Sequence, residues 1–148
     1  MIEKVKYIRI LDKLRLPREE YLLTGGAWLA IMDIRVNGDL DIIASSRLYE
    51  IYNDHFNRLD SKWKRRASKH LDKSKTRARK VASISGYSIE EIIKQQYVEV
   101  DGYRFLKFDI FKRYKKSRKR PKDRKDLKSI SRFFAKSRHL DPGYKNLF

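Results

Sequence analysis

The chain has 148 residues, and positive charge dominates its composition. It contains 37 lysines and arginines against 19 aspartates and glutamates, which gives a formal net charge of +18. A field of this sign attracts polyanions, so we expect nucleic acid, RNA or DNA, as the partner. The chain has no cysteine, which excludes disulfides and thiolate metal sites. It has no apolar stretch of transmembrane length and no apolar segment typical of a signal peptide at its start, so we expect a cytoplasmic protein without a membrane partner.

A chain of this length predicts one domain. Residues 2–15 carry apolar side chains at helical spacing, which predicts one amphipathic helix before Pro17. Residues 21–23 predict a short strand, and residues 27–34 predict a helix of about two turns. After a turn at Asn37 and Gly38, residues 39–43 predict a buried strand.

Two features of this stretch carry chemistry. Gly25 and Gly26 precede the apolar helix, and without side chains they let a phosphate approach the backbone at a helix start. Asp39 and Asp41 alternate along the predicted strand, so we expect both carboxylates on one face. Paired carboxylates suit Mg²⁺ or Mn²⁺ held together with substrate phosphates. The alternative is a plain tight turn and two solvated acids, but the order and spacing of the four residues favour the functional interpretation.

This run resembles the signature of the nucleotidyltransferase superfamily, which includes DNA polymerase beta and RNA-tailing enzymes. The signature is a strand, a glycine pair, a short helix and an Asp-apolar-Asp strand, here filled by Gly25, Gly26, Asp39 and Asp41. The resemblance implies an α+β fold with a mixed sheet flanked by helices. It also implies Asp39 and Asp41 as catalytic metal ligands and a nucleoside triphosphate bound at the glycines. Ala27 departs from the pattern, because many members place a phosphate-binding serine nearby.

The next stretch contains the first of two basic blocks. Ser45 or Ser46 predicts the N-cap of a helix over residues 47–57. Residues 62–80 form this block, in which basic residues crowd around Trp63. Such a block suits a surface that tracks a nucleic-acid backbone, although a solvated helix with Trp63 in the core fits equally well. Residues 76–84 predict a return to a strand. The nucleic-acid-binding candidates of this block are Lys62, Lys64, Arg65, Arg66 and Lys69.

Local signals are clear in the second half of the chain. Ser88 with Glu91 forms a capping box and predicts a short helix through Lys94. Asp-Gly at residues 101–102, between two alternating segments, predicts a β-hairpin over residues 97–106.

Two helices are predicted after this hairpin, one over residues 108–116 and one over residues 122–136, with Pro121 between them. Residues 139–148 predict an irregular tail after a domain over residues 1–138. A second basic block spans the junction of the helices, and its nucleic-acid-binding candidates are Lys112, Arg113, Lys116, Arg118, Lys119 and Arg120.

Residues 86–127 resemble the C-terminal half of small prokaryotic and phage nucleotidyltransferase-like proteins. The likeness rests on the hairpin, a lysine about two helical turns later at Lys115, and an Arg-Pro-Lys-Asp-x-x-Asp helix start at residues 120–126. It implies that Lys115 and Lys122 contact triphosphate oxygens as point charges. Asp123 either pairs with one of these lysines or, like Asp126, anchors a neighbouring arginine.

One departure leaves two functions open. Catalytic members carry a third acid on a strand beside the Asp-x-Asp strand, but residues 77–84 contain no carboxylate. The first hypothesis is a nucleotidyltransferase that moves a nucleoside monophosphate to a hydroxyl acceptor, such as an RNA or tRNA end. The second is a non-catalytic nucleic-acid-binding protein on a degenerate fold of this type. A protein partner and the oligomeric state stay open.

Overall fold

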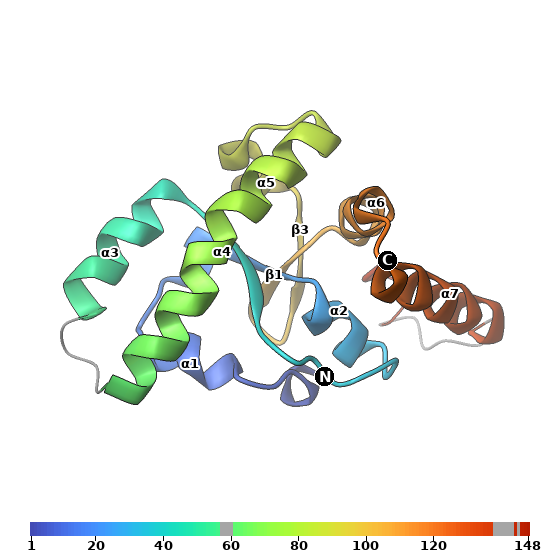
Figure 1. Cartoon of the computed structure of the whole chain (residues 1–148), viewed down its shortest axis with the longest axis horizontal. Coiled ribbons are helices and arrows are strands. Elements are labelled where there is room, and N and C mark those ends of the chain that lie inside the picture. Colours follow the sequence, from blue (N-terminus) through green and yellow to red (C-terminus); the bar gives the residue numbers. More distant parts are fainter. Residues whose placement is uncertain (57–60, 138–143, 145) are drawn as a thin grey trace.

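Figure 1 shows a computed structural model of the chain. It describes the backbone of residues 1–56, 61–137, 144 and 146–148, and the side chains of these residues except 52–72. Helices surround one mixed sheet, so the predicted α+β class is confirmed. Within the described part of the chain, no helix has the length and apolar character needed to cross a membrane.

The sheet has four strands in the order β2-β1-β4-β3. They are β1 (Tyr21–Thr24), β2 (Asp41–Ala44), β3 (Tyr97–Val100) and β4 (Tyr103–Leu106). The central strand β1 is buried throughout; it pairs antiparallel with β2 and parallel with β4. Thr24, the last residue of β1, lies directly opposite Asp41 at the start of β2. This register sets the floor of the site described below.

The prediction of a single helix over residues 2–15 is wrong. The chain instead forms a 3-10 helix, η1 (Ile2–Lys4), and a helix, α1 (Ile8–Lys13), before the short η2 (Arg18–Glu20). Tyr7 separates them with a φ of 69°, a left-handed conformation that ends any right-handed helix. The apolar periodicity therefore identified the buried side of this segment but not the break within it.

Helix α2 (Gly26–Ile31) is buried along its whole length and is anchored by Trp28. The indole Nε1 of Trp28 donates a hydrogen bond to the Leu106 carbonyl at 2.9 Å. Its ring meets Phe105 and Phe108 edge to face, with centroid distances of 5.1 and 5.4 Å. A buried ring with a satisfied N–H fixes α2 against β4, and it thereby fixes the glycine turn that precedes the helix.

The strand expected over residues 39–43 starts later than predicted. Because β2 begins at Asp41, Asp39 precedes the strand, and the prediction that both acids alternate along it is wrong. Asn37 fixes the segment that precedes β2. Its buried side chain donates hydrogen bonds to the Asp39 and Lys6 carbonyls and accepts one from the Lys6 N–H.

Two helices follow β2. The Ser45 hydroxyl accepts from the Leu48 N–H at 3.2 Å, which confirms Ser45 as a cap of α3 (Ser46–Phe56). Helix α4 (Ser61–Ser85) then runs through the region where a strand over residues 76–84 was expected, so that prediction is wrong. Ser74, Arg77, Ala78 and Val81 are buried at helical spacing, and this face packs on β2.

The remaining local predictions agree well with the structure. Ser88 caps α5 (Ile89–Gln95) by accepting from the Glu91 N–H at 3.1 Å. The hairpin of β3 and β4 has the predicted bounds, with positive φ at both turn residues. Helix α6 (Phe108–Arg118) runs two residues past its expected end, and α7 (Pro121–Lys136) has the proline in its first turn.

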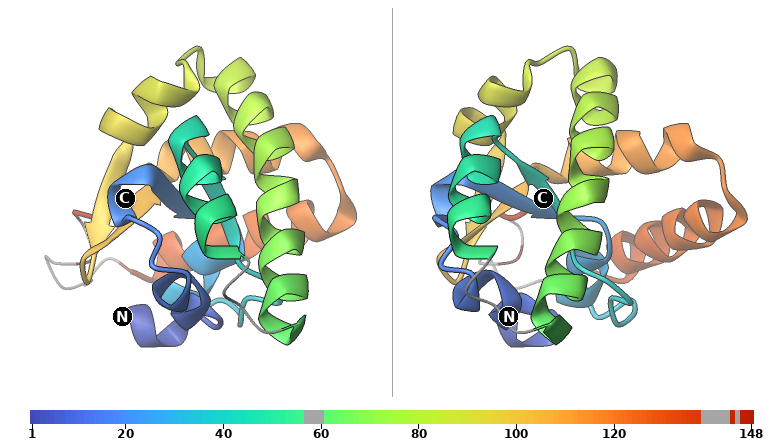
Figure 2. Two further views of the ribbon diagram at one scale, coloured as in Figure 1. Left: turned by 90° about the vertical axis from the view of Figure 1, so that its left-hand side faces the viewer. Right: turned by 60° about the vertical axis from the view of Figure 1, so that its left-hand side comes forward.

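Helices α6 and α7 run side by side and project from the sheet, joined by a bend at Lys119 and Arg120 (Figure 2). Most of the expected irregular tail over residues 139–148 lies outside the described residues. Its end packs on the core, because the Phe148 ring meets Phe108 and Phe134 at centroid distances of 5.0 and 5.2 Å.

Replacing Trp28 tests the anchor of α2. Trp28→Phe keeps an aromatic ring but removes the donor to Leu106 and leaves a void, so we expect the unfolding free energy to fall by about 2 kcal/mol. Urea denaturation measures this loss. The exposed Tyr87→Phe serves as a control, and equal stability of the two variants would contradict the anchoring role.

Candidate functional site

One cleft gathers residues that lie far apart in the sequence. The six residues expected to bind the metal or the nucleotide, Gly25, Gly26, Asp39, Asp41, Lys115 and Lys122, all line its inner part. Thr24, Arg35, Arg77, Phe111, Tyr114, Arg118, Arg120 and Asp123 complete that lining. The inner part therefore lies where β1 ends and β2 begins, between α4 and the α6–α7 pair.

The cleft has a narrow floor and a wide mouth. The inner part has a free volume of about 40 Å³, space for a cation or a few waters. The outer part measures about 430 Å³, a size typical of small-molecule sites. Both parts share Asp39, Asp41 and Arg77, so they form one continuous site.

Contacts within the protein explain why residues 25 and 26 are glycines. Gly25 has φ 61° and ψ −128°, a conformation that side chains disfavour, and a Cβ there would overlap the Asp41 carboxylate. A Cβ on Gly26 would lie 2.9 Å from the Asn37 Cβ. The two glycines therefore let Asp41 and Asn37 approach the turn before α2. Phosphate binding at this turn stays a prediction.

Arg77 controls Asp41 from the opposite side. Its guanidinium donates to the Asp41 Oδ1 at 2.7 Å and to the Ile42 carbonyl at 2.9 Å. Arg77 is 9% exposed, so this ion pair is largely shielded from solvent. The residue belongs to the segment in which the family resemblance places a third acid. Residues 77–84 therefore place the Arg77 guanidinium beside Asp41 and contribute no carboxylate.

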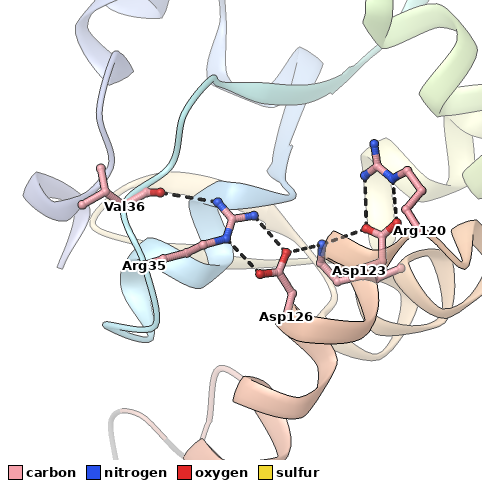
Figure 3. A network of polar contacts seen from close by, with 6 residues as sticks. Arg35, Val36, Arg120, Asp123 and Asp126 are labelled. Atoms are coloured by element: carbon pink, nitrogen blue, oxygen red, sulfur yellow. Dashed lines mark hydrogen bonds and ion pairs between the residues drawn. The ribbon is translucent and has the colours of Figure 1, made fainter.

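A chain of alternating charges forms one wall of the cleft (Figure 3). Arg35 donates through two nitrogens to Asp126, both at 2.9 Å. Lys115 bridges Asp126 and Asp123 at 2.8 and 3.2 Å, and Arg120 donates to both oxygens of Asp123 at 2.7 and 3.1 Å. Each aspartate therefore anchors an arginine and also holds Lys115, so both roles considered for Asp123 occur together.

The network keeps its carboxylates ionised. Burial alone would raise the pKa of Asp123, but hydrogen bonds from Arg120 and Lys115 outweigh it and lower the pKa to about 2. Asp126 follows the same pattern, because bonds from Arg35 and Lys115 outweigh burial and lower its pKa. The bond to Asp126 in turn raises the pKa of Arg35. Both aspartates and Arg35 are therefore charged at neutral pH.

The residues of the floor fit a single metal ion bound together with phosphates. The Asp39 carboxylate accepts no hydrogen bond from the described residues, whereas Asp41 accepts one from Arg77 through Oδ1 and turns Oδ2 toward Gly25. The buried Thr24 Oγ1 beside them has no partner within the described part of the protein. In that part, no group of three or more His, Cys, Asp or Glu comes together. Two carboxylates plus phosphates are a common set for Mg²⁺.

The candidates for nucleic-acid binding divide into four sets. Arg118 and Arg120 line the cleft, and Arg113 instead donates to the Ile84 carbonyl at 2.8 Å. The side chains of Lys62, Lys64, Arg65, Arg66 and Lys69, like that of Trp63, lie outside the described residues. The described residues that line the cleft do not include Lys112, Lys116 and Lys119.

Sequence reasoning missed Arg35, Arg77 and Thr24 as cleft residues. Small or apolar residues at positions 74, 78 and 81 have helical spacing, and this was a signal for a continuous α4. Such a helix would have placed Arg77 on the same face. The sequence contained no comparable signal for the pairing of Arg35 with Asp126, which is 91 positions away.

Comparisons with known proteins add no assignment, because no family model, curated protein or solved structure matches this chain.

Two glycines test the contact between the turn and Asp41. Gly25 and Gly86 both have positive φ, but a Cβ at Gly86 meets nothing within 4 Å. Gly86→Ala should therefore lower the free energy of unfolding by about 1 kcal/mol, because it adds only backbone strain. Gly25→Ala also displaces Asp41, so it should lower the free energy of unfolding by at least about 2 kcal/mol more. Thermal and urea unfolding measure the difference, and equal losses would contradict the contact.

The pH dependence of stability tests the charged network. The pKa of Asp123 is about 2 in the folded protein against a usual 3.8, so its ion pairs stabilise the fold above pH 4 and lose this effect as pH falls toward 2. The lost stabilisation is about 2 kcal/mol. In Asp123→Asn this component is missing, so the stability difference from wild type should shrink between pH 5 and pH 2. Exposed Asp109→Asn is the control, and a difference that stays constant with pH would refute the prediction.

Proposed function

We propose that the cleft is the active site of a Mg²⁺-dependent nucleotidyltransferase. It would move a nucleoside monophosphate from a nucleoside triphosphate to a hydroxyl of a nucleic-acid acceptor. The observation that carries the proposal is the convergence at one cleft of the glycine pair, Asp39, Asp41, Lys115 and Lys122. These residues come from both ends of the chain and were selected from the sequence by two separate motifs.

The charge of the cleft supports a phosphate-rich ligand. Six cationic side chains line its inner part against three carboxylates. The cations are Arg35, Arg77, Lys115, Arg118, Arg120 and Lys122. Fixed positive charge at a partly shielded site stabilises phosphate groups and the charge that develops on them during transfer.

The charged network assigns different tasks to these cations. Lys115 and Arg35 are held by buried carboxylates, so they present a preorganised positive wall. Lys122 is exposed at the start of α7 and is available for triphosphate oxygens. Arg77 orients Asp41 by holding its Oδ1.

The metal is expected on Asp39 and the Oδ2 side of Asp41. When bound, Mg²⁺ would neutralise and align phosphate oxygens.

The transfer step follows from this arrangement. The acceptor hydroxyl oxygen attacks the α-phosphorus, and a new oxygen–phosphorus bond forms. The bond between the α-phosphorus and the bridging oxygen to the β-phosphate breaks, and pyrophosphate leaves with that electron pair. The hydroxyl proton passes to solvent. Positioning and charge neutralisation supply most of the rate enhancement in reactions of this type.

One observation favours a second candidate function. Arg77 neutralises Asp41, and the segment expected to carry a third acid has none. A protein that retained the phosphate-binding charges without the chemistry would bind nucleic acid and transfer nothing.

Label transfer separates the two functions. Each α-³²P nucleoside triphosphate is incubated with total tRNA, other RNA or single-stranded DNA, with Mg²⁺ or Mn²⁺. We expect label on one acceptor class with the wild type, and a loss of at least about 100-fold in Asp39→Asn/Asp41→Asn, because both ligands of the ion are removed.

The matched control is Asp33→Asn/Asp109→Asn, which changes two exposed aspartates outside the cleft and should keep full transfer. If no acceptor is labelled while both double variants and the wild type bind nucleic acid with the same salt dependence, the transferase proposal fails and the binding function is selected.

A further inference from the structure

The outer part of the cleft is a cationic groove between two helical walls. Helix α4 forms one wall, and the bend between α6 and α7 forms the other, with Asp39 and Asp41 between them. The walls consist of Lys73, Thr76, Arg77 and Lys80 on one side and Tyr114, Arg118, Arg120 and Lys122 on the other. Parts of both basic blocks of the sequence therefore face each other across one groove.

The α4 wall has the spacing of a backbone-tracking surface. Its lining residues recur at positions i, i+3, i+4 and i+7, which is one face of a helix. Lys73 and Lys80 lie two turns apart, about 10.5 Å along the axis. This length matches about three phosphates of a stacked strand. Both lysines are exposed, and neither forms an ion pair with a described residue, so their charges are available to a ligand.

The opposite wall combines fixed and available cations. Arg120 is fixed by its two bonds to Asp123, and the Arg118 guanidinium lies over the Tyr114 ring, 5.4 Å from its centroid. Lys122 is exposed and forms no ion pair with the described part of the chain. These residues sit at the bend where α6 ends, as Lys119 adopts a left-handed φ of 55°.

We propose that this groove binds the acceptor as a single nucleic-acid strand. Its phosphates lie between Lys73 and Lys80 on α4 and Arg118 at the bend, and its end points to the floor at Asp39. Binding of the strand follows from the groove itself, whereas its role as acceptor rests on the proposed function.

The size and chemistry of the groove favour a single strand over other polyanions. A volume of about 430 Å³ admits one or two nucleotides in the outer part of the cleft but not a double helix. Protein interfaces need an apolar core, and this groove is lined by charged residues, Thr76 and Tyr114. The exposed large hydrophobic residues of the described chain, Tyr7, Val36, Tyr87 and Phe134, lie outside the groove, which argues against a membrane surface.

The test is fluorescence anisotropy with a labelled twelve-nucleotide RNA over a range of salt concentrations. Lys73→Glu/Lys80→Glu reverses both lysine charges of the α4 wall. We expect at least about tenfold weaker binding at 100 mM salt, and a salt slope smaller by about 1.4 because each phosphate contact on a single strand contributes about 0.7.

The matched control is Arg79→Glu/Lys128→Glu, which makes the same change in net charge. Arg79 lines a different cavity beside Tyr49, and Lys128 is exposed on α7. This variant should keep the wild-type salt slope. Equal slopes and equal losses in both double variants would show that only the overall charge attracts RNA, and the groove proposal would be overturned.

Two competitors test the class of ligand. A duplex of the same length and a polyglutamate of matched charge should each displace the labelled RNA at least about tenfold less well than unlabelled single strand. Equal competition by either one would overturn the assignment to a single strand.

Calorimetric titration with Mg²⁺ and each nucleoside triphosphate separates this proposal from the proposed function. Lys73→Glu/Lys80→Glu should keep the wild-type nucleotide affinity within about threefold, because the floor of the cleft is unchanged. Loss of nucleotide binding in this variant would mean that the α4 wall holds the nucleotide instead of the strand. If the wild type binds no nucleotide but still binds RNA through Lys73 and Lys80, the transferase proposal is refuted. The proposal that the groove binds a single strand is then kept.

Discussion

The cleft depends on five charges that alternate through a shielded space. Arg35 follows α2, Lys115 lies on α6, and Asp123 and Asp126 lie on α7 with Arg120 just before it, so the ion pairs tie three separate segments together. The two aspartates are 1% and 3% exposed. Each buried aspartate is compensated both by an arginine and by Lys115, so the loss of one cation leaves that aspartate with a single partner. The projecting α6–α7 pair is therefore held at one place relative to β1 and β2.

A second constraint acts on the floor. Gly25 has no side chain, so the Asp41 carboxylate approaches the turn from one side while Arg77 of α4 holds it from the other. Trp28 fixes the same turn to β4. Together with the charged network, these contacts preorganise a surface on which carboxylates are few and cations are many. Such a site needs little rearrangement to receive a phosphate chain, and this is the physical basis for placing the chemistry there.

The sequence predicted best what depends on local chemistry. The Asp-Gly hairpin, the Ser88 cap and Pro121 in the first turn of α7 each depend on residues within a few positions, and each is present in the structure. The glycine pair, Asp39, Asp41, Lys115 and Lys122 lie together at one cleft, and their roles stay a prediction. Prediction failed where long-range packing decides. Helix α4 was missed over residues 76–84 because its buried face is narrow and interrupted by Arg77. The partners of Arg35 and Arg77 depend on the folded arrangement of distant segments, so periodicity alone could not reveal them.

The most direct test of the account is the location of a bound nucleotide. Amide chemical shifts of isotope-labelled protein would be followed while a non-hydrolysable nucleoside triphosphate and Mg²⁺ are added. The account predicts saturable shifts concentrated at Gly25, Gly26, Asp41, Lys115 and Lys122, with none at the hairpin turn of Asp101 and Gly102. Shifts confined to other surfaces, or no saturable shift at millimolar nucleotide, would contradict the claim that this cleft is a nucleotide site.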